Sequence, residues 1–205
     1  IGRLIYEKEQ LEHIIALYGM WTGTITTGIA LLREIDPYSK TNVPENLVLG
    51  SGYAIFAGLE QVIEYIKNIR FTSEDISYLK SLNMFDDDFL DYLKKFRFTG
   101  DIYAVPEGTV VFPMEPLLKV TAPIIEAQLV ETAILNIINH QSLIATKASR
   151  VCYAAKGDPI MEFGLRRAQG PDAGTLGARA AVIGGCVGTS NVLAAKKFGI
   201  PALGT

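Results

Sequence analysis

The sequence predicts an α/β fold, and the pattern of its last quarter gives the clearest reason. Between residues 157 and 205, strand signals alternate with helical ones, and ten of the chain's 19 glycines separate them. Strands and helices that alternate at this spacing form right-handed βαβ units around a parallel sheet. The elements expected here are a strand at 159–165, a helix of small residues at about 174–182, a short strand, a helix at 191–198 and a strand at 200–203.

The region before it, from residue 51 to about 157, predicts further helices and short strands. Residues 58–69 have helical spacing, and Thr72 to Asp75 give a capping signal for a short helix that ends near Lys80. The aspartates at 86–88 suit the start of the next helix, because carboxylates favour the positive end of the helix dipole; a metal role for this triplet is the alternative.

Strand signals follow at 102–105, 109–112 and 117–121, with proline and glycine between them. A long helical pattern then runs from Thr121 to Ala155. Its polar cluster Asn139–Ser142 predicts a bend or a break into two helices. His140, inside that cluster, is either a catalytic base or a structural histidine.

The composition excludes several classes of protein. The net charge of −3 and the lack of a basic stripe argue against a nucleic-acid partner, because such surfaces need clustered Lys and Arg. Two cysteines without a CxxC pair, together with two histidines, cannot form a standard zinc site. We expect Cys152 and Cys186 to be small buried residues of a reduced, cytoplasmic protein.

Residues 14–32 form an uncharged run that accounts for much of the mean hydropathy of +0.23. The run is 19 residues long, which is enough to span a membrane, but seven of the residues are Gly or Thr. Such a composition suits a packed or broken membrane segment, or a buried turn of a soluble protein. A membrane partner is therefore expected only if residues 14–32 insert.

Candidate site residues follow the predicted strands of the last quarter, where parallel sheets gather functional groups. Arg166 and Arg167 are suited to bind phosphate oxygens, or else form a solvated surface pair. The segment 188–191 offers amides and hydroxyls for an anion, although a plain helix cap has the same residues. No dinucleotide or P-loop glycine motif is present.

Several motifs, in order, carry a specific family resemblance over about three quarters of the chain. They are SGYAIFAGLE at 51–60, VPEGT at 105–109, QLVET at 128–132, IATKA at 144–148, EFGLRR at 162–167, GPD at 170–172 and GGCVGTSN at 184–191. In these motifs the chain resembles nicotinate phosphoribosyltransferases.

The resemblance implies a type II phosphoribosyltransferase: an N-terminal α+β sandwich domain followed by the first part of a TIM-like α/β barrel. The domains are then expected at 51–157 and 158–205. The implied reaction joins nicotinate to phosphoribosyl pyrophosphate to give nicotinate mononucleotide for NAD biosynthesis, with ATP and Mg²⁺ as cofactors. A homodimer is expected for the full-length enzyme.

The resemblance also assigns substrate-binding residues. Phe163 matches an aromatic residue that stacks on the pyridine ring, and Arg166, with Arg167 beside it, serves the phosphate side. Ser190 stands where nicotinamide-using relatives carry Asp, which would repel the carboxylate of nicotinate. Thr205 matches a threonine that contacts nicotinate. The family's phosphorylated histidine would lie just past Thr205, so we expect no catalytic residue in this chain and no turnover by it alone.

Residues 1–50 depart from that family. The stretches YGMWTGT at 18–24, TGIALLREIDP at 27–37 and ENLVLGSG at 45–52 are similar to part of a bacterial sodium/glutamate symporter. We interpret residues 1–50 as a foreign segment joined near Gly50. The alternatives to an enzyme fragment are a transporter fragment fused to an enzyme remnant, and a non-catalytic ligand-binding remnant.

Overall fold

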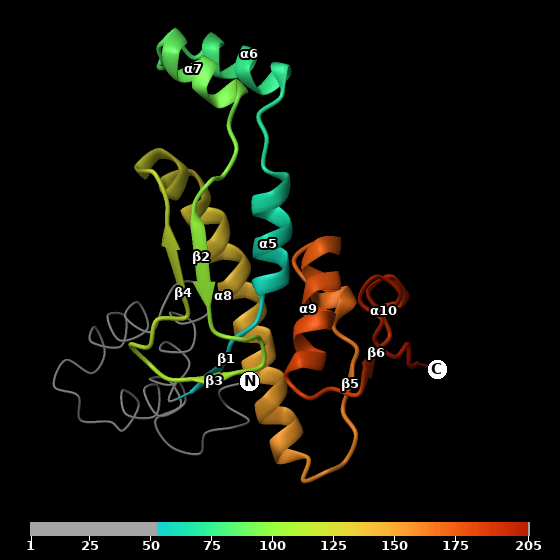
Figure 1. The fold of residues 1–205 in the computed structure, drawn as a ribbon. Helices are drawn as coiled ribbons and strands as arrows, with labels where there is room; N and C mark the ends of the chain where they lie inside the picture. Colours follow the sequence, from blue (N-terminus) through green and yellow to red (C-terminus); the bar gives the residue numbers. More distant parts are fainter. Residues whose placement is uncertain (1–52, 205) are drawn as a thin grey trace, which may run out of the picture. The chain divides into compact units, whose positions relative to one another are not determined.

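A computed structural model describes residues 53–204, and Figure 1 shows its fold. The foreign segment predicted at 1–50, the uncharged run at 14–32 and Thr205 lie outside the described residues. Residues from Ala54 onward belong to one compact unit. None of the helices between residues 53 and 204 combines the length and the hydropathy that a membrane crossing requires.

The centre of this unit is one long helix, α8 (Ile124–Ala154), against which α5 (Leu59–Asn68), α9 (Pro171–Ile183) and the short strand β1 (Ala54–Ile55) pack. Small residues of α9 contact α8. Ala180 packs in one cluster with Ala145, and Ala181 packs in another with Ala148. The buried residues of α9 are all small: Gly174, Thr175, Gly177, Ala178, Ala180 and Ala181.

The break into two helices expected at Asn139–Ser142 is wrong, because α8 is continuous from residue 124 to 154. The polar side chains serve a neighbour instead. Ser142 Oγ accepts a hydrogen bond from Ala57 N at 3.0 Å and lies 3.0 Å from Ala57 O, to which it donates. One turn later, Thr146 Oγ1 accepts from Ile55 N at 2.9 Å. These hydroxyls bond backbone groups at the buried end of β1, which explains polar residues on a buried helix face.

The short helix predicted after the capping signal at Thr72–Asp75 and ending near Lys80 is confirmed as α6 (Ser73–Ser81). The helix predicted to begin at the aspartates 86–88 is confirmed as α7 (Asp87–Lys94). Thr72 and Asp75 form a capping box, and the Asp86 side chain accepts from Phe89 N at 2.8 Å. Two of the three aspartates at 86–88 thus have structural partners, since Asp87 pairs with Lys80 at 2.8 Å. The two helices share a small apolar core around Ile76, Leu90 and Leu93.

The three strands predicted at 102–105, 109–112 and 117–121 are confirmed, the first shifted by one residue and the other two shorter. They are β2 (Asp101–Ala104), β3 (Val110–Val111) and β4 (Leu118–Thr121). Strands β2 and β4 pair antiparallel with Asp101 opposite Thr121, and β3 pairs antiparallel with β1. The hydrophobic side of the β2–β4 pair covers a core that α5 and α8 contribute, formed by Val62, Ile66, Val130 and Ile134.

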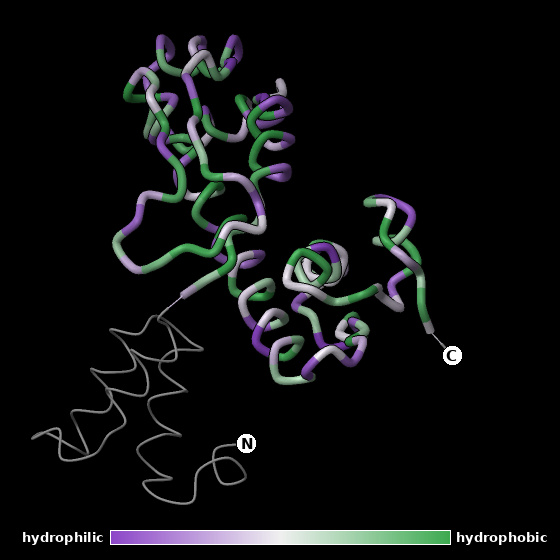
Figure 2. Tube along the Cα trace, turned by 60° about the horizontal axis from the view of Figure 1, so that its bottom comes forward, coloured by the Kyte–Doolittle hydropathy of each residue, from purple (hydrophilic) through white to green (hydrophobic). Residues whose placement is uncertain are grey.

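The predicted parallel βαβ unit is confirmed in the last quarter of the chain. Strand β5 (Met161–Glu162) pairs parallel with β6 (Gly188–Thr189), and α9 connects them. Helix α10 (Val192–Phe198) follows, and a parallel bridge joins Thr189 to Ala202. Figure 2 shows the hydrophobic stretch that forms this last bridge and runs to the C-terminus.

The strands of this unit are shorter than the sequence suggests. The strand predicted at 159–165 ends at Glu162, because the chain then turns into a 3₁₀ helix, η1 (Leu165–Arg167). The strand predicted at 200–203 is reduced to the bridge at Ala202. This last segment packs tightly on β6: a Cβ at Gly188 would lie 2.6 Å from Leu203 Cδ1 and 2.7 Å from Pro201 O. Glycine at position 188 therefore lets the segment 201–203 approach.

Candidate functional site

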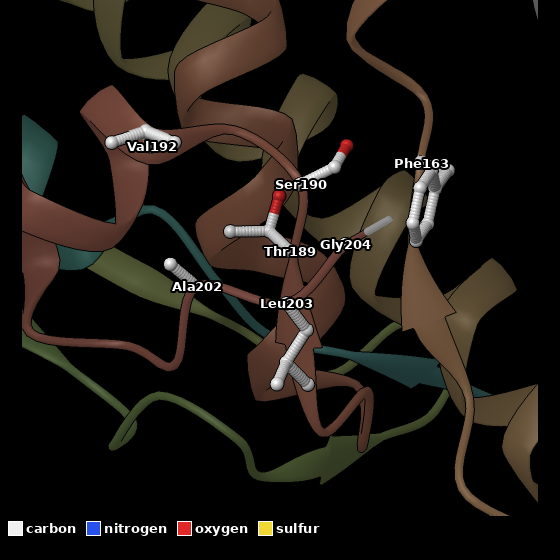
Figure 3. Close-up of a pocket in the computed structure, with 7 residues that line it drawn as sticks. All are labelled: Phe163, Thr189, Ser190, Val192, Ala202, Leu203 and Gly204. Carbon is white, nitrogen blue, oxygen red and sulfur yellow. The ribbon is translucent and has the colours of Figure 1, made fainter.

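The ends of the parallel strands meet around a pocket, as the sequence predicts for such a sheet. Its volume is about 320 Å³. Three separate segments line it, one after β5, one across β6 and one at the end of the described chain (Figure 3). The lining residues are Phe163, Thr189, Ser190, Val192, Ala202, Leu203 and Gly204.

Phe163 and Ser190 are the predicted site residues that the structure brings together here. Each follows directly on a strand, Phe163 after β5 and Ser190 after β6. Phe163 is 48% exposed, and Ser190 is half-buried with its backbone N donating to Glu162 O at 3.0 Å. Figure 3 shows Gly204 between the two side chains, with Val192 at the opposite end of the lining. The pocket thus offers an aromatic ring face and a neutral hydroxyl to one ligand.

Below the pocket, Glu162 joins the two strand ends. Thr189 Oγ1, on a fully buried residue, donates to Glu162 Oε2 at 2.6 Å, and Gly164 N donates to Glu162 Oε1. Thr189 Oγ1 also accepts from Asn191 N at 3.0 Å. The carboxylate therefore fixes both the turn that presents Phe163 and the strand that presents Ser190.

The sequence reasoning gave Glu162 no role beyond its place in a family motif. The available signal was an acidic residue at the end of a predicted strand, immediately before Phe163 and Gly164. Its partner Thr189 lies 27 residues later, so the pairing depends on the tertiary fold.

The predicted arginines do not line the pocket. Arg166 and Arg167 lie in η1, which begins two residues after Phe163, and both are exposed. Within residues 53–204, no ion pair to a carboxylate is found for either side chain. The pair is therefore adjacent to the pocket and accessible to solvent. Thr205 lies outside the described residues, and its neighbour Gly204 lines the pocket.

His140 and the cysteines lie away from the pocket lining. His140 Nε2 is 3.3 Å from Ala173 O, so the ring contacts the first turns of α9. Cys186 is buried, as expected, whereas Cys152 is only half-buried.

A second charged group, which the sequence reasoning missed, clamps α9 to α5. Arg179 Nη1 and Nη2 donate to Glu107 Oε1 and Oε2 at 3.0 and 2.6 Å. The same carboxylate accepts from the backbone N of Gly58 at 2.6 Å and of Leu59 at 3.0 Å, at the start of α5. Glu60 makes a further ion pair with Arg179 at 2.6 Å.

This clamp shifts the pKa of both main partners. Burial alone would raise the pKa of Glu107, but the hydrogen bonds from Arg179 and from the backbone of Gly58 and Leu59 outweigh it, so the pKa lies below its ordinary value. The hydrogen bond to Glu107 raises the pKa of Arg179. Glu107 stands in the motif VPEGT, but its partner is 72 residues away.

Comparisons with known proteins agree with this fold. Residues 44–139 match the family model of the nicotinate phosphoribosyltransferase (NAPRTase) N-terminal domain. The match begins just before the stretch 45–52, which we assigned to the symporter-like segment.

Curated relatives carry the match further. The chain is 52% identical over 156 residues to a nicotinate phosphoribosyltransferase of Mycobacterium tuberculosis, and 52% identical over 155 residues to that of Bacillus subtilis. Each alignment covers 76% of this chain. The chain spans about a third of the length of these relatives, 34% and 32%. They give no support to the transporter alternative.

Solved structures show the same relationship. The crystal structure of human nicotinic acid phosphoribosyltransferase superposes with a TM-score of 0.71 at 36% identity, over 76% of this chain and 32% of that one. A nicotinate-nucleotide pyrophosphorylase from Pyrococcus furiosus superposes with a TM-score of 0.59 at 25% identity, over 45% of its own length. The expected fold class, that of a type II phosphoribosyltransferase, is confirmed. By motif, sequence identity and fold, the three quarters of the chain that these relatives cover belong to the nicotinate phosphoribosyltransferase family.

Proposed function

We propose that this chain is part of an enzyme that joins nicotinate to phosphoribosyl pyrophosphate, giving nicotinate mononucleotide and pyrophosphate for NAD biosynthesis. Its family membership supports the reaction class. The observation that carries the assignment to a site is the pocket at the strand ends, where Phe163 and Ser190 face one small hollow.

The pocket has the chemistry that nicotinate needs. The half-exposed ring of Phe163 provides a flat face on which a pyridine ring can stack. The hydroxyl of Ser190 can donate a hydrogen bond to a carboxylate oxygen, and it carries no negative charge that would repel the carboxylate. A volume of about 320 Å³ lies at the lower end of the usual range for ligand pockets, which suits a single-ring substrate.

The phosphate side of the substrate is proposed to meet η1. Arg166 and Arg167 are exposed and follow Phe163 closely, so a phosphate held beside the stacked ring would lie near two guanidinium groups. Guanidinium groups bind phosphate oxygens through paired hydrogen bonds. Thr205 is proposed to contact nicotinate, on the family resemblance and because Gly204 lines the pocket.

ATP and Mg²⁺ are proposed as cofactors on the family resemblance alone. Among residues 53–204, no three His, Cys, Asp or Glu side chains group together as ligands for a metal ion. The described residues therefore do not form a protein cage for Mg²⁺, and the two carboxylate oxygens of Glu162 are already engaged. Mg²⁺ commonly binds through substrate phosphates with one or two carboxylates, so its contacts are assigned to phosphoribosyl pyrophosphate.

Calorimetric titration of the chain with nicotinate tests this assignment, with Phe163→Ala as the site variant. We expect the substitution to weaken binding at least about tenfold, because it removes the stacking face. Phe112→Ala is the matched control, since Phe112 is similarly exposed, at 55%, and does not line the pocket. Equal affinity of the two variants, or no binding of nicotinate by the unmodified chain, would contradict the proposed site.

A further inference from the structure

The two cysteines of the chain form a pair on the side of α9 that faces α8. Cys152 lies in the last turn of α8, and Cys186 lies in the connector between α9 and β6. Both belong to one apolar cluster with Ala148 and Ala181. A Cβ at Gly185 would be 3.4 Å from both Cβ and Sγ of Cys152, so the end of α8 rests on the connector next to Cys186.

The two thiols differ in burial, and this difference assigns them different roles in a disulfide exchange. Cys152 is half-buried and is therefore the more accessible of the two residues. Cys186 is 7% exposed, and burial, with the neighbouring Cys152, raises the pKa of its thiol to about 12. Cys186 is therefore shielded from direct attack, while its position next to Cys152 allows it to react with that residue.

We propose that Cys152 and Cys186 are a redox-active pair, which a small-molecule disulfide such as oxidised glutathione converts into a disulfide between α8 and the α9–β6 connector. The proposal is independent of the proposed function. Because the chain has only these two cysteines, no other intramolecular disulfide competes.

The reaction balances in two exchange steps. The Cys152 thiolate first attacks one sulfur of oxidised glutathione, forms a mixed disulfide and releases one glutathione thiolate, which takes up a proton. Cys186 then loses its proton and attacks Cys152 Sγ, so that the second glutathione leaves as a thiol. Overall the two protein thiols give two electrons and two protons to the oxidant.

The disulfide would act on the connector that leads into the pocket. Cys186 precedes β6 by only one residue, Val187, and Ser190 follows β6 directly. The closed ring would join residues 152 and 186, and such a cross-link restricts the unfolded chain. We expect oxidation to raise the midpoint of thermal unfolding by about 5 °C or more.

The test is peptide mapping of the full chain after incubation with oxidised glutathione, with the digest kept non-reduced. We expect one peptide pair linked through Cys152 and Cys186, with a mass lower by two hydrogen atoms than the two reduced peptides. A non-reducing gel should show monomer. Recovery of both thiols free after long incubation, or a disulfide between two chains, would overturn the proposal.

Two variants distinguish the roles of the two thiols in the exchange reaction. Cys186→Ala should stop at the mixed disulfide, with one stable glutathione on Cys152, whereas Cys152→Ser should leave Cys186 unmodified. Glutathione on Cys186 in the Cys152→Ser variant would overturn the assignment of Cys152 as the attacking thiol. If a variant does not fold, the linked peptide of the unmodified chain and its higher melting temperature after oxidation still decide the question.

Discussion

The Thr189 hydroxyl donates to Glu162 Oε2 at 2.6 Å, and this bond joins the ends of two parallel strands beneath the pocket. The other oxygen of the same carboxylate accepts from Gly164 N. Phe163 lies between Glu162 and Gly164, and Ser190 follows Thr189. Through these two partly buried hydrogen bonds, the Glu162 carboxylate positions the aromatic ring and the hydroxyl relative to one another.

Thr189→Val removes that hydrogen bond while it keeps the shape of the side chain. Because it leaves Glu162 Oε2 and the amide of Asn191 without a partner, we expect a loss of about 1–3 kcal/mol in the free energy of unfolding. Nicotinate affinity should fall with it. Chemical denaturation and calorimetry measure the two effects.

Thr189→Ser serves as the control, because it keeps the hydroxyl and loses only a methyl group. It should retain most of the affinity for nicotinate. If the valine and serine variants bind nicotinate equally, Glu162 does not position the site through Thr189.

The sequence predicted the elements whose determinants are local. Thr72 with Asp75, and Asp86 at the next helix, are caps that operate within a few residues, and both helices begin where these caps predict. The convergence of Phe163, Ser190 and Gly204 was also predictable, because parallel strands carry their carboxyl ends to one edge.

What the sequence did not predict depends on partners distant along the chain. The polar cluster Asn139–Ser142 was interpreted as a bend or a break, because the partner of Ser142, the backbone of Ala57, is 85 residues away. The same reason explains why Glu107 and Arg179, 72 residues apart, were not recognised as a clamp. The domain boundary near residue 157 stays a prediction.

Ser190→Asp tests the specificity of the pocket. An aspartate at this position would place a negative charge beside the carboxylate of nicotinate, so we expect nicotinate binding to weaken at least about tenfold, while binding of neutral nicotinamide should not fall. Calorimetry with the two pyridines measures both. Ser190→Ala is the control, and it should cost about 0.5–1.5 kcal/mol of nicotinate binding, the contribution of one hydrogen bond. If the aspartate variant keeps the same preference between nicotinate and nicotinamide, the carboxylate of nicotinate does not lie beside residue 190.

Gly188→Ala tests the close approach of residues 201–203 to β6. The added Cβ would meet Leu203 Cδ1 at 2.6 Å and Pro201 O at 2.7 Å, and the second of these is backbone. We expect a loss of about 1–3 kcal/mol in the free energy of unfolding, measured by chemical denaturation. Gly177→Ala is the control in α9, where the new Cβ would meet only the flexible end of Ile144, at 3.1 Å. A larger loss for the control would contradict this account of how residues 201–203 pack on β6.

The Glu107–Arg179 clamp should make stability depend on pH in the acid range. The pKa of Glu107 is lower in the folded chain than its ordinary value of 4.5, so the folded state favours the charged carboxylate. This stabilisation is complete above about pH 4.5 and is lost as the pH falls through the lowered pKa. Glu107→Gln should be less stable by about 2–3 kcal/mol at neutral pH, since it leaves the Arg179 guanidinium partly unpaired. Chemical denaturation of the unmodified chain and of the Glu107→Gln variant between pH 7 and 3 checks this. The difference between their free energies of unfolding should shrink toward pH 3. A difference that is constant with pH would contradict an ionised Glu107 in the clamp.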